Sequence, residues 1–371
     1  MRKGWEYKRW KEVLTIINGK NQSAVVDENG EYPIYGSGGI MGYANNWLCP
    51  ENCVIIGRKG NINKPIFVET KFWNVDTAFG LNANKEYLLP KFLYYFCLDY
   101  NFERHNKAVT IPSLTKADLL KIDIPLPPKS TQLAIVSELD KINELIRLKK
   151  EQLKDFDNLA QSLFYEMFGD PVENEKGWEV HLLKALCTKI GSGATPKGGS
   201  ESYKEEGTSL IRSLNIHNNE FKFKDLAYID DDQADSLNNV IVQGNDVLLN
   251  ITGASVARCC IVPTEVLPAR VNQHVCILRH GNLIDAKYLN RLLTNDNYQQ
   301  LLQRLAKSKA ATREALPKSI VDKLSIPLPP LSLQRLFAQR IEQIEREKSE
   351  VQKSIQDLET LLASRMQYWF E

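Results

Sequence analysis

The chain has 371 residues and carries 47 lysines and arginines against 46 aspartates and glutamates, a net charge of +1. Its composition, 43% hydrophobic and 25% charged, is that of ordinary globular proteins, and its length predicts roughly two to three domains. Such a chain cannot bind a polyanion through its bulk charge, so nucleic-acid binding would have to come from local patches. The N-terminal sequence MRKGWEYKRW lacks the apolar stretch of a signal peptide, and no apolar run approaches ~18 residues, which predicts a soluble cytoplasmic protein with no membrane partner.

The cysteines form neither a disulfide framework nor a metal site. Their number is odd, and no secretion signal is present. Neither Cys49 and Cys53 nor Cys259 and Cys260 has a second Cys or His pair at zinc spacing nearby. We therefore expect no metal, and we expect free thiols that pack as small buried hydrophobic side chains. The cysteines are Cys49, Cys53, Cys97, Cys187, Cys259, Cys260 and Cys276.

An internal repeat decides the predicted architecture. KGWEYKRWKEVLTIINGK, from Lys3, matches KGWEVHLLKALCTKIGSG, from Lys176, at an offset of 173 residues. KAVTIPSLTKADLLKIDIPLPP, from Lys107, matches KAATREALPKSIVDKLSIPLPP, from Lys309, at an offset of 202 residues. The second copy is therefore 29 residues longer between these anchors, and we expect the extra residues in loops inside the unit.

The body of each copy has the patterns of short strands and helices. NCVIIGRKGNINKPIFVE, residues 52–69, has β-branched runs broken at Gly57, Gly60 and Asn63, which predicts a hairpin. Residues 245–262 are its expected counterpart. Residues 87–101 and 283–297 have the apolar spacing of helices. The chain is therefore predicted to be α+β, with two similar mixed α/β domains.

After each IPLPP sequence the apolar residues recur in steps of three and four and are flanked by Glu, Lys and Arg, which predicts the a/d seam of a coiled coil. The prolines lack an N–H and disfavour helix before them, so each motif predicts an extended entry to a long helix. Ser130 or Thr131, and Ser332, are the expected N-caps, and Gly169 begins the expected end of the first helix. The seam residues are Val136, Leu139, Ile142, Ile146, Lys149, Leu153, Phe156, Ala160, Leu163 and Met167, then Ile341, Ile344, Lys348, Val351, Ile355, Leu358, Leu362, Arg365 and Trp369.

Two apolar stripes of matching length predict that the long helices pack against each other. The second KGWE begins within ten residues of Phe168, so the first helix leads from one domain to the next. An antiparallel second helix would return and bring MQYWFE near Met1, which predicts a pseudo-twofold arrangement of two domains separated by a two-helix coiled coil. Helices of ~36 residues at ~1.5 Å per residue would be ~54 Å long. The predicted boundaries are 1–124 for the first domain, 125–170 for the first helix, 171–326 for the second domain and 327–371 for the second helix.

Two similar but non-identical domains at a fixed distance suit the reading of two sites on double-stranded DNA. Basic, amide-rich stretches such as GRKGNINK and ERHNKAVT support this, because Arg and Lys neutralise phosphates or read guanine while Asn and Gln suit adenine. The alternative for each residue is a solvated surface with no ligand. The candidate DNA-binding residues are Ser37, Tyr43, Arg58, Lys59, Asn61, Asn63, Lys64, Arg104, His105, Lys107, Arg212, Asn215, Asn250, Thr252, Arg258, Asn272, Gln273, His274, Lys307, Lys309 and Arg313.

Four features of the sequence occur together, and they are the repeated KGWE starts, YPIYGSGGIMGY at 32–43, TIPSLTKADLLKIDIPLPPKSTQ at 110–132 with its second copy, and the two charged helices. In these motifs the chain resembles the specificity subunit of type I restriction–modification enzymes. The resemblance covers essentially the whole chain. It implies two target recognition domains, each reading one part of a bipartite asymmetric DNA sequence, on helices that form the platform for two adenine methyltransferase subunits, to which restriction subunits can add. It also implies a non-catalytic chain with no cofactor of its own, with S-adenosylmethionine, Mg and ATP expected only in partner subunits.

The catalytic alternatives lack their motifs. The Leu-Pro-Pro sequences at 126–128 and 328–330 are not the Asp/Asn-Pro-Pro-Tyr/Phe box that a methyltransferase needs, and IGSGATPKGGS at 190–200 lacks the Gly-Lys-Ser/Thr of a P-loop. Glu69-Thr70-Lys71 has no preceding Pro-Asp at the spacing expected of a nuclease. Two other functions remain open: a coiled-coil scaffold for protein assembly, and the specificity subunit of another methylase–nuclease type.

Overall fold

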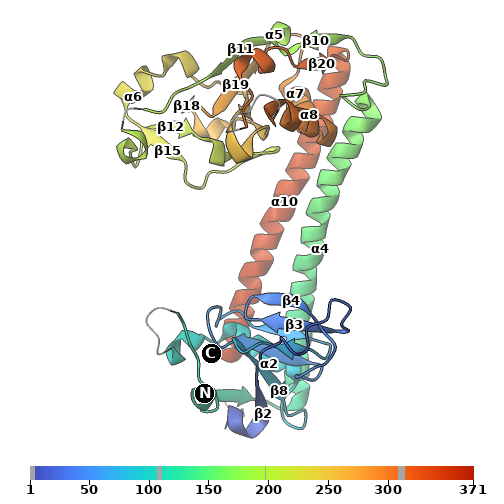
Figure 1. Cartoon of the computed structure of the whole chain (residues 1–371), viewed down its shortest axis with the longest axis vertical. Helices are drawn as coiled ribbons and strands as arrows, with labels where there is room; N and C mark the ends of the chain where they lie inside the picture. The colour runs from blue at the N-terminus through green and yellow to red at the C-terminus, as the bar shows by residue number, and fades with distance from the viewer. Residues whose placement is uncertain (1–4, 107–110, 197, 308–313) are drawn as a thin grey trace. The chain divides into compact units, whose positions relative to one another are not determined.

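The structure is a computed structural model that describes residues 5–106, 111–196, 198–307 and 314–371. The chain divides into two compact units, unit 1 with Met1–Glu151 and Val351–Glu371, and unit 2 with Gln152–Glu350. Each unit contains one globular domain and a segment of each of two 40-residue helices, α4 (Lys129–Phe168) and α10 (Leu331–Phe370) (Figure 1). Within the described residues, no helix is both long enough and apolar enough to cross a membrane.

The domain of unit 1 is built on two small sheets. A four-stranded antiparallel sheet has the order β2-β8-β5-β6, and a three-stranded sheet has the order β4-β3-β7, in which β3 and β7 are parallel. Strands β1 and β9 pair separately next to the start of α4. The elements are β1 (Glu6–Arg9), α1 (Trp10–Val13), β2 (Leu14–Asn18), β3 (Tyr32–Gly36), β4 (Gly39–Ala44), β5 (Cys53–Gly57), β6 (Ile66–Val68), β7 (Trp73–Asn74), β8 (Ala78–Ala83), α2 (Pro90–Asp99), the 3-10 helix η1 (Phe102–His105), α3 (Lys116–Leu119) and β9 (Asp123–Leu126).

Unit 2 repeats this plan with more loop structure. Its four-stranded sheet has the order β11-β19-β16-β17, its three-stranded sheet the order β15-β12-β18, and β10 pairs with β20. The elements are β10 (Val180–Leu182), α5 (Leu183–Leu186), β11 (Cys187–Ser192), β12 (Thr208–Ile211), β13 (Ile216–His217), β14 (Glu220–Phe221), β15 (Ala227–Ile229), α6 (Asp231–Asp235), β16 (Val247–Asn250), β17 (Cys259–Ile261), β18 (Ala269–Val271), β19 (Val275–His280), α7 (Ala286–Leu293), α8 (Asp296–Lys307), α9 (Lys318–Val321) and β20 (Ser325–Pro327), with 3-10 turns at Gly199–Ser202, Ser213–Asn215, Asn238–Val240, Gly253–Ser255 and Thr264–Val266.

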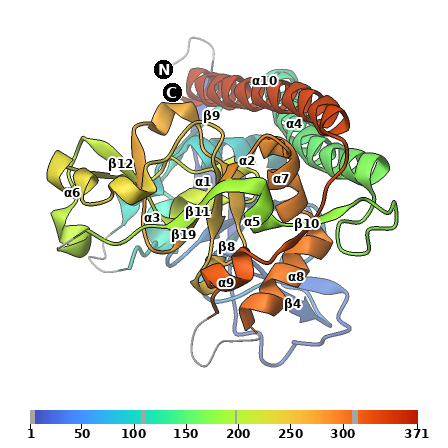
Figure 2. The same ribbon diagram turned by 90° about the horizontal axis from the view of Figure 1, so that it is seen from above.

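The extra length of the second copy lies between strands, as predicted. In unit 1 only residues 37–38 separate β3 from β4, whereas residues 212–226 separate the equivalent β12 and β15 and contain the β13–β14 hairpin. Helix α6 is a second addition, between β15 and β16, and lies at the opposite end of the unit from α7 and α8 (Figures 1 and 2). The additions leave the two sheets unchanged because they lie outside the strands.

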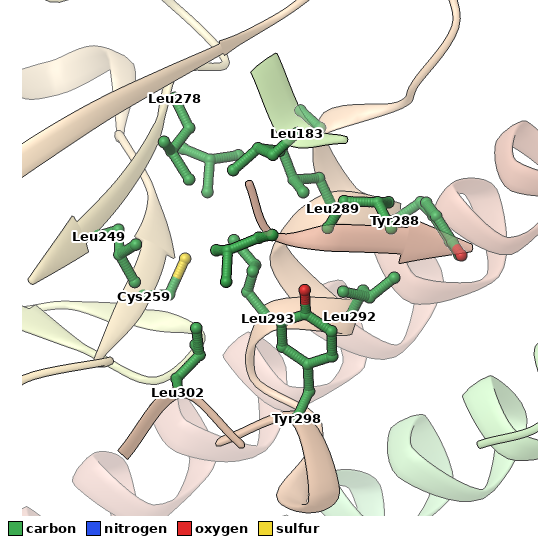
Figure 3. Packing of buried hydrophobic residues seen from close by; sticks show 14 of the residues in the cluster. Leu183, Leu249, Cys259, Leu278, Tyr288, Leu289, Leu292, Leu293, Tyr298 and Leu302 are labelled. Atoms are coloured by element: carbon green, nitrogen blue, oxygen red, sulfur yellow. The ribbon is translucent and has the colours of Figure 1, made fainter. Parts of the chain in front are cut away.

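The predicted hairpins form the centre of each domain. Strands β5 and β6 pair antiparallel within residues 52–69, and β16 and β17 do so within residues 245–262. Their apolar runs are continuous because each strand is covered on both faces. Val54 and Ile56 belong to the core that also contains α2 and the start of α4. Ile55 lies on the opposite face of the strand, toward the three-stranded sheet. In unit 2, Leu249 packs with α7 and α8 (Figure 3), and Leu248 packs with the other sheet.

The helix predicted at 87–101 is confirmed as α2, whose Phe92, Tyr95 and Phe96 are buried. The helix predicted at 283–297 is confirmed only in part. It is interrupted between α7 and α8, where the Asn295 side chain accepts a hydrogen bond from Asn297 N at 3.1 Å and so turns the chain. The α8 side chains Tyr298 and Leu302 thereby join Leu289 and Leu293 of α7 in one core (Figure 3).

All seven cysteines are free, and six of them are buried, as expected for small hydrophobic side chains. Burial raises the pKa of the Cys53 thiol to about 12 and also raises the pKa of Cys259. These thiols are therefore protonated at neutral pH and poorly reactive.

The long helices begin directly after the prolines, so the N-caps predicted from hydroxyl side chains were wrong. Helix α4 begins at Lys129 and α10 at Leu331, each directly after a Pro-Pro pair. The Pro128 carbonyl accepts hydrogen bonds from Thr131 N and Gln132 N, at 2.8 and 3.0 Å, and Pro330 does the same for Leu333 N and Gln334 N. At the other end of α4, Gly169 has the positive φ of a helix terminator, 75°, as predicted.

In unit 1 the start of α4 pairs antiparallel with the end of α10. Arg365 donates two hydrogen bonds to the Glu138 carboxylate, and Trp369 Nε1 donates a third at 3.1 Å. Further along, Lys150 pairs with Glu359 at 2.8 Å. The indole of Trp369 also stacks on Trp5, with ring centroids 6.4 Å apart, so the end of α10 lies against the beginning of the described chain.

In unit 2 the remaining segments pair in the same sense. Phe164 and Phe168 of α4 pack edge-on against Phe337 of α10, with ring centroids 5.7 and 5.1 Å apart, and Asp157 pairs with Lys348. The Phe168 carbonyl accepts a hydrogen bond from Trp178 Nε1 at 2.9 Å. Trp178 belongs to the second KGWE and Trp5 to the first, so each helix end meets the tryptophan of one repeat.

We predict that Glu138→Gln lowers the free energy of unfolding of unit 1 at pH 7 by about 1 kcal/mol. The hydrogen bond from Arg365 is the main reason that the pKa of Glu138 lies below its ordinary value. A carboxyl group of this kind stabilises the fold above its unfolded-state pKa, and this contribution disappears as the pH falls through the folded-state pKa. The difference between the wild-type protein and the variant should therefore shrink as the pH is lowered from 7 to 3.

Urea denaturation followed by tryptophan fluorescence measures this, because Trp178 is the only tryptophan of the sequence outside unit 1. Glu86→Gln, at an exposed side chain with no ion pair among the described residues, is the control. A difference between the wild-type protein and Glu138→Gln that is independent of pH would contradict the prediction.

Candidate nucleic-acid interface

The basic stretch GRKGNINK forms the loop between β5 and β6 in unit 1. Its backbone is fixed on two sides: Arg58 N donates to Thr77 O at 2.8 Å, while Gly60 N donates to Pro112 O at 3.1 Å. Leu114 N adds a third hydrogen bond, to Arg58 O at 2.9 Å, and we call these three backbone hydrogen bonds the loop frame. The loop is therefore held between the start of β8 and residues 111–114, and it presents its side chains from a rigid base.

The β3–β4 turn lies next to this loop. A Cβ atom built on Gly60 would lie 3.9 Å from Ser37 Oγ, and one built on Gly38 would lie 3.7 Å from Asn61 Nδ2. Tyr43 projects from β4 with 47% of its surface exposed. Two candidates of YPIYGSGGIMGY, Ser37 and Tyr43, therefore belong to the same hairpin, and the turn brings Ser37 next to the basic loop.

The loop carries positive charge that the protein does not neutralise. Arg58, Lys59 and Lys64 are exposed, and in the described part of the chain none of them lies within 4 Å of an acidic side chain. The Arg58 guanidinium lies 5.8 Å from the centre of the Phe79 ring, which supports its stem. Unpaired cations on a fixed loop form an anion-binding surface.

The other candidates of unit 1 differ in what they contact. Asn61 is exposed, whereas Asn63 accepts a hydrogen bond from Phe102 N at 2.8 Å and donates one to Asn101 Oδ1 at 3.3 Å. Arg104 is exposed on η1, and the His105 ring stacks on Tyr100 and hydrogen-bonds its hydroxyl at 2.6 Å. Lys107 lies outside the described residues. Asn63 and His105 thus hold neighbouring segments together.

Unit 2 has the same frame around its β16–β17 loop. Ile251 N donates to His274 O at 2.9 Å, Gly253 N to Glu314 O at 2.9 Å, and Leu316 N to Ile251 O at 2.8 Å. These bonds correspond one by one to those around Arg58 and Gly60. The frame residues of the loop are therefore equivalent at an offset of 193, and Arg58 and Lys59 of unit 1 correspond to Ile251 and Thr252 of unit 2.

The polar candidates of this second frame form a chain of side-chain hydrogen bonds. Thr252 Oγ1 and His274 Nδ1 are 2.6 Å apart, and the other ring nitrogen of His274 lies 3.1 Å from Gln273 Nε2. Thr195 Oγ1 donates to Gln273 Oε1. Gln273 is exposed, whereas Thr252 and His274 are half-buried. The series of hydrogen bonds therefore reaches the surface of unit 2 at the position equivalent to the basic loop of unit 1.

Three asparagines of unit 2 point into the protein. Asn215 and Asn250 have no exposed surface, and Asn272 is almost as buried. Asn215 accepts from Arg212 N at 3.1 Å, Asn250 donates to Ser213 O at 2.9 Å, and Asn272 accepts from His274 N at 3.0 Å. These hydrogen bonds shape the turns between strands, and the DNA contacts of the three asparagines stay a prediction.

The basic candidates of unit 2 are more dispersed. The Arg212 guanidinium lies 5.2 Å from the centre of the Tyr203 ring and donates to Asp225 O. Arg258 is half-buried on the β16–β17 loop, and Lys307 lies 3.8 Å from Glu314. Lys309 and Arg313 lie outside the described residues. Among all the residues that the structure describes, in both units, no group of three or more His, Cys, Asp or Glu side chains could hold a metal ion.

Sequence reasoning missed two buried glutamines, Gln132 and Gln334, although both repeated motifs contain them. Each is the fourth residue after the second proline of its motif. A polar residue at the same position in both repeats could have indicated a shared structural role. The sequence pattern around it predicts only a helix start. It also missed residues 111–114 and 314–316, whose backbone forms one side of each loop frame.

The fold and the two loop frames define a class of protein with two similar α+β domains, each packed on segments of the same two long helices. A family model for the type I restriction modification DNA specificity domain matches residues 2–155 and 175–360. The chain belongs to this family, and the prediction of a type I specificity subunit with two recognition domains and an α+β fold is confirmed.

Similar proteins agree with this assignment. The type I restriction enzyme MjaVIII specificity subunit of Methanocaldococcus jannaschii is 22% identical over 96% of this chain and 92% of that protein. A putative type I restriction enzyme specificity subunit of Haemophilus influenzae is 31% identical over 38% of each chain. The crystal structure of the S subunit of a type I restriction–modification system from M. genitalium has the same fold, with a TM-score of 0.61 at 16% identity over 99% of this chain and 96% of that one. A chain from a study of complex assembly in the type I R-M system has a TM-score of 0.62 at 19% identity over 99% and 97% of the two chains.

We predict that Asn63→Ala lowers the free energy of unfolding of unit 1 by about 1 kcal/mol, because Phe102 N loses its acceptor. The same substitution at Asn61, on the same loop, should change it by less than about 0.5 kcal/mol, because this exposed side chain makes no hydrogen bond to a described residue. Urea denaturation followed by tryptophan fluorescence compares the two variants. Equal losses in both would mean that Asn63 does not anchor the loop.

Proposed function

We propose that this chain reads a bipartite, asymmetric DNA sequence for a type I restriction–modification enzyme, with one half read by each globular domain. The observation that carries this proposal is the pair of equivalent loop frames. The backbone hydrogen bonds around Gly60 recur around Gly253, yet the side chains on the two frames differ. Equal frames place two loops alike, and different side chains give each loop its own base preference.

The chemistry of the two frames suits DNA in different ways. In unit 1 the exposed Arg58, Lys59 and Lys64 suit phosphates and guanine edges. In unit 2 the exposed Gln273, with the half-buried Thr252 and His274, offers side-chain hydrogen-bond donors and acceptors, and the half-buried Arg258 lies on the same loop. Two loops with different side chains support two unlike half-sites, and hence an asymmetric sequence.

The long helices supply a surface for partner subunits. In unit 1 an open groove of about 680 Å³ runs along α4. Leu133 and Leu145, which line it, are 62% and 48% exposed, and Asp140, Lys141 and Glu144 form its charged border. Apolar side chains exposed along one helix face suit a partner helix. We assign this surface to a methyltransferase subunit, of which two are expected, with restriction subunits added to the assembly.

The proposal leaves catalysis to those partners. S-adenosylmethionine, Mg and ATP are assigned to partner subunits, and the chain itself is proposed to be a non-catalytic cytoplasmic protein. A pure scaffold for protein assembly, the second candidate, would also use the α4 groove. The unpaired cations of the β5–β6 loop favour the DNA-reading function over it.

Exchanging residues 1–124 for the corresponding domain of another family member should change one half of the recognised sequence and leave the other half unaltered. The physical reason is that each loop frame is built from residues of its own domain. Sequencing of methylated adenines in the DNA of cells that make the assembled enzyme gives both halves. A change in both halves would contradict the proposal.

The double variant Lys59→Ala/Lys64→Ala should weaken binding of the chain to DNA of any sequence. Each phosphate contact that is lost should reduce the slope of log K against log salt by about 1, so a reduction of about 2 is expected. Titration of labelled duplexes at several salt concentrations measures it. Lys85→Ala is the control, because Lys85 follows the opposite end of β8 from the loop. A slope that does not change would exclude these lysines from the interface.

A further inference from the structure

Gln132 and Gln334 are fully buried polar side chains at equal positions in the two repeats. Each is the fourth residue after the second proline of its motif, in the first turn of α4 or α10, and each has 0% exposed surface. A buried amide in an apolar core costs free energy unless its donors and its acceptor are all used. The structure uses them in the same way in both units.

In unit 1 the Gln132 side chain joins three segments of the chain. Its Oε1 accepts a hydrogen bond from Leu89 N at 2.9 Å, and its Nε2 donates to Tyr87 O at 2.8 Å and to Pro127 O at 3.0 Å. Leu89 directly precedes α2, and no side chain caps this helix start. The amide therefore links the start of the domain helix to the neck, which is the extended segment 123–128 directly before α4, and to the long helix.

Gln334 makes the equivalent three bonds in unit 2. Its Oε1 accepts from Asp285 N at 2.9 Å, and its Nε2 donates to Pro329 O at 2.8 Å and to Leu283 O at 3.3 Å. Asp285 directly precedes α7, as Leu89 precedes α2. The recurrence in two domains with different loops indicates that this link serves the attachment of a domain to its helix.

A charged contact lies farther along each helix pair. Lys91 and Tyr95 of α2 both bond to Asp140 of α4, at 2.9 and 2.6 Å. In unit 2, Lys287 and Arg291 of α7 pair with Glu345 of α10, at 2.8 and 3.4 Å. These partners are partly exposed, so the glutamine is the buried member of the two contacts. The direction of α2 relative to α4 is thus fixed at two points.

We infer that Gln132 and Gln334 are positioning residues that fix the angle between each recognition domain and its long helix, and thereby restrict the spacer length that the protein accepts between its two half-sites. This inference rests on the proposed function. Within the described residues, the hydrogen bonds of both side chains go to residues outside the loop frames, so neither glutamine should affect which bases are read. Loss of the amide bonds should loosen the attachment while the packing of Ile135, Val136 and Leu139 keeps the domain on its helix.

The test uses Gln132→Met and Gln334→Met, which keep the length of the side chain and remove its hydrogen bonds. The full chain is produced with its methyltransferase subunits, and methylated adenines of the host DNA are sequenced. We expect the same half-site bases as in the wild-type protein, with sites of a spacer one base pair longer or shorter methylated at least tenfold more often relative to the main spacer.

The matched control is Ile34→Ala, in the small core of β3 far along the chain from the neck, which also removes a buried contact in unit 1. It should reduce methylation without a change of spacer. If the glutamine variants behave as Ile34→Ala does, or abolish methylation altogether, they are merely structural residues and the inference is overturned.

A second measurement, on the purified full chain, separates loosening from unfolding. Hydrogen exchange should become at least tenfold faster at the amide of Leu89 in Gln132→Met, while the β8 amides such as Leu81 N exchange as in the wild-type protein. Faster exchange throughout unit 1 would overturn the inference. A wild-type protein that yields no bipartite motif would instead overturn the proposed function, so the two failures are distinguishable.

Discussion

The apolar stripes of α4 and α10 must be buried, and within each unit the start of one helix covers the end of the other. Ile135, Val136 and Leu139 of α4 share a core with Leu362, Met366 and Phe370 of α10, and Phe337 and Ile341 of α10 share one with Phe164 and Phe168 of α4. This pairing also receives the domains. Phe370 packs on Phe92 of α2, with ring centroids 5.2 Å apart, and Phe168 packs on Tyr288 of α7, at 4.8 Å. Each domain core therefore continues into the helix pair.

The recurrence of the loop frames shows that the loop side chains can vary while the backbone hydrogen bonds stay the same. Backbone atoms make the frame bonds, so the side chains at positions 58, 59 and 61 are free to differ from those at 251, 252 and 254. The 212–226 insertion enters between two strands of the smaller sheet without altering the register of the larger one. Recognition chemistry can change in such a domain at little cost in stability, because the core and the reading surface use different atoms.

Much of the fold could be predicted because its signals are periodic. The repeat offsets predicted two equivalent units, and the breaks at Gly57, Gly60 and Asn63 predicted the β5–β6 hairpin. The helix N-caps were wrong because hydroxyl side chains are the usual caps, whereas here the Pro128 and Pro330 carbonyls accept the first helical hydrogen bonds. The break between α7 and α8 was missed because residues 283–297 keep their apolar spacing through it.

The candidate site was harder to predict because sequence indicates residue type and not direction. Asn61 and Asn63 are two residues apart on one loop, yet the Asn61 side chain is exposed whereas that of Asn63 accepts a hydrogen bond from Phe102 N. Asn215 and Asn250 fill hydrogen bonds inside the domain through contacts with residues up to 37 positions away. Such partners are set by the tertiary fold, which local patterns do not encode. The described basic candidates all keep part of their surface exposed, since charged side chains seldom lose their contact with water, and their contacts with DNA stay a prediction.

The two glutamines explain why both repeats contain the IPLPP sequence together with a glutamine four residues after its last proline. The two prolines before each long helix provide carbonyl acceptors but no N–H donor. An amide side chain one turn later supplies donors to the neck and to the domain, and an acceptor for the N–H that precedes the domain helix. A hydroxyl is too short to make three such bonds, and a carboxylate has no donor. The same side chain therefore joins the extended segment, the start of the long helix and the domain helix. This arrangement occurs once for each domain.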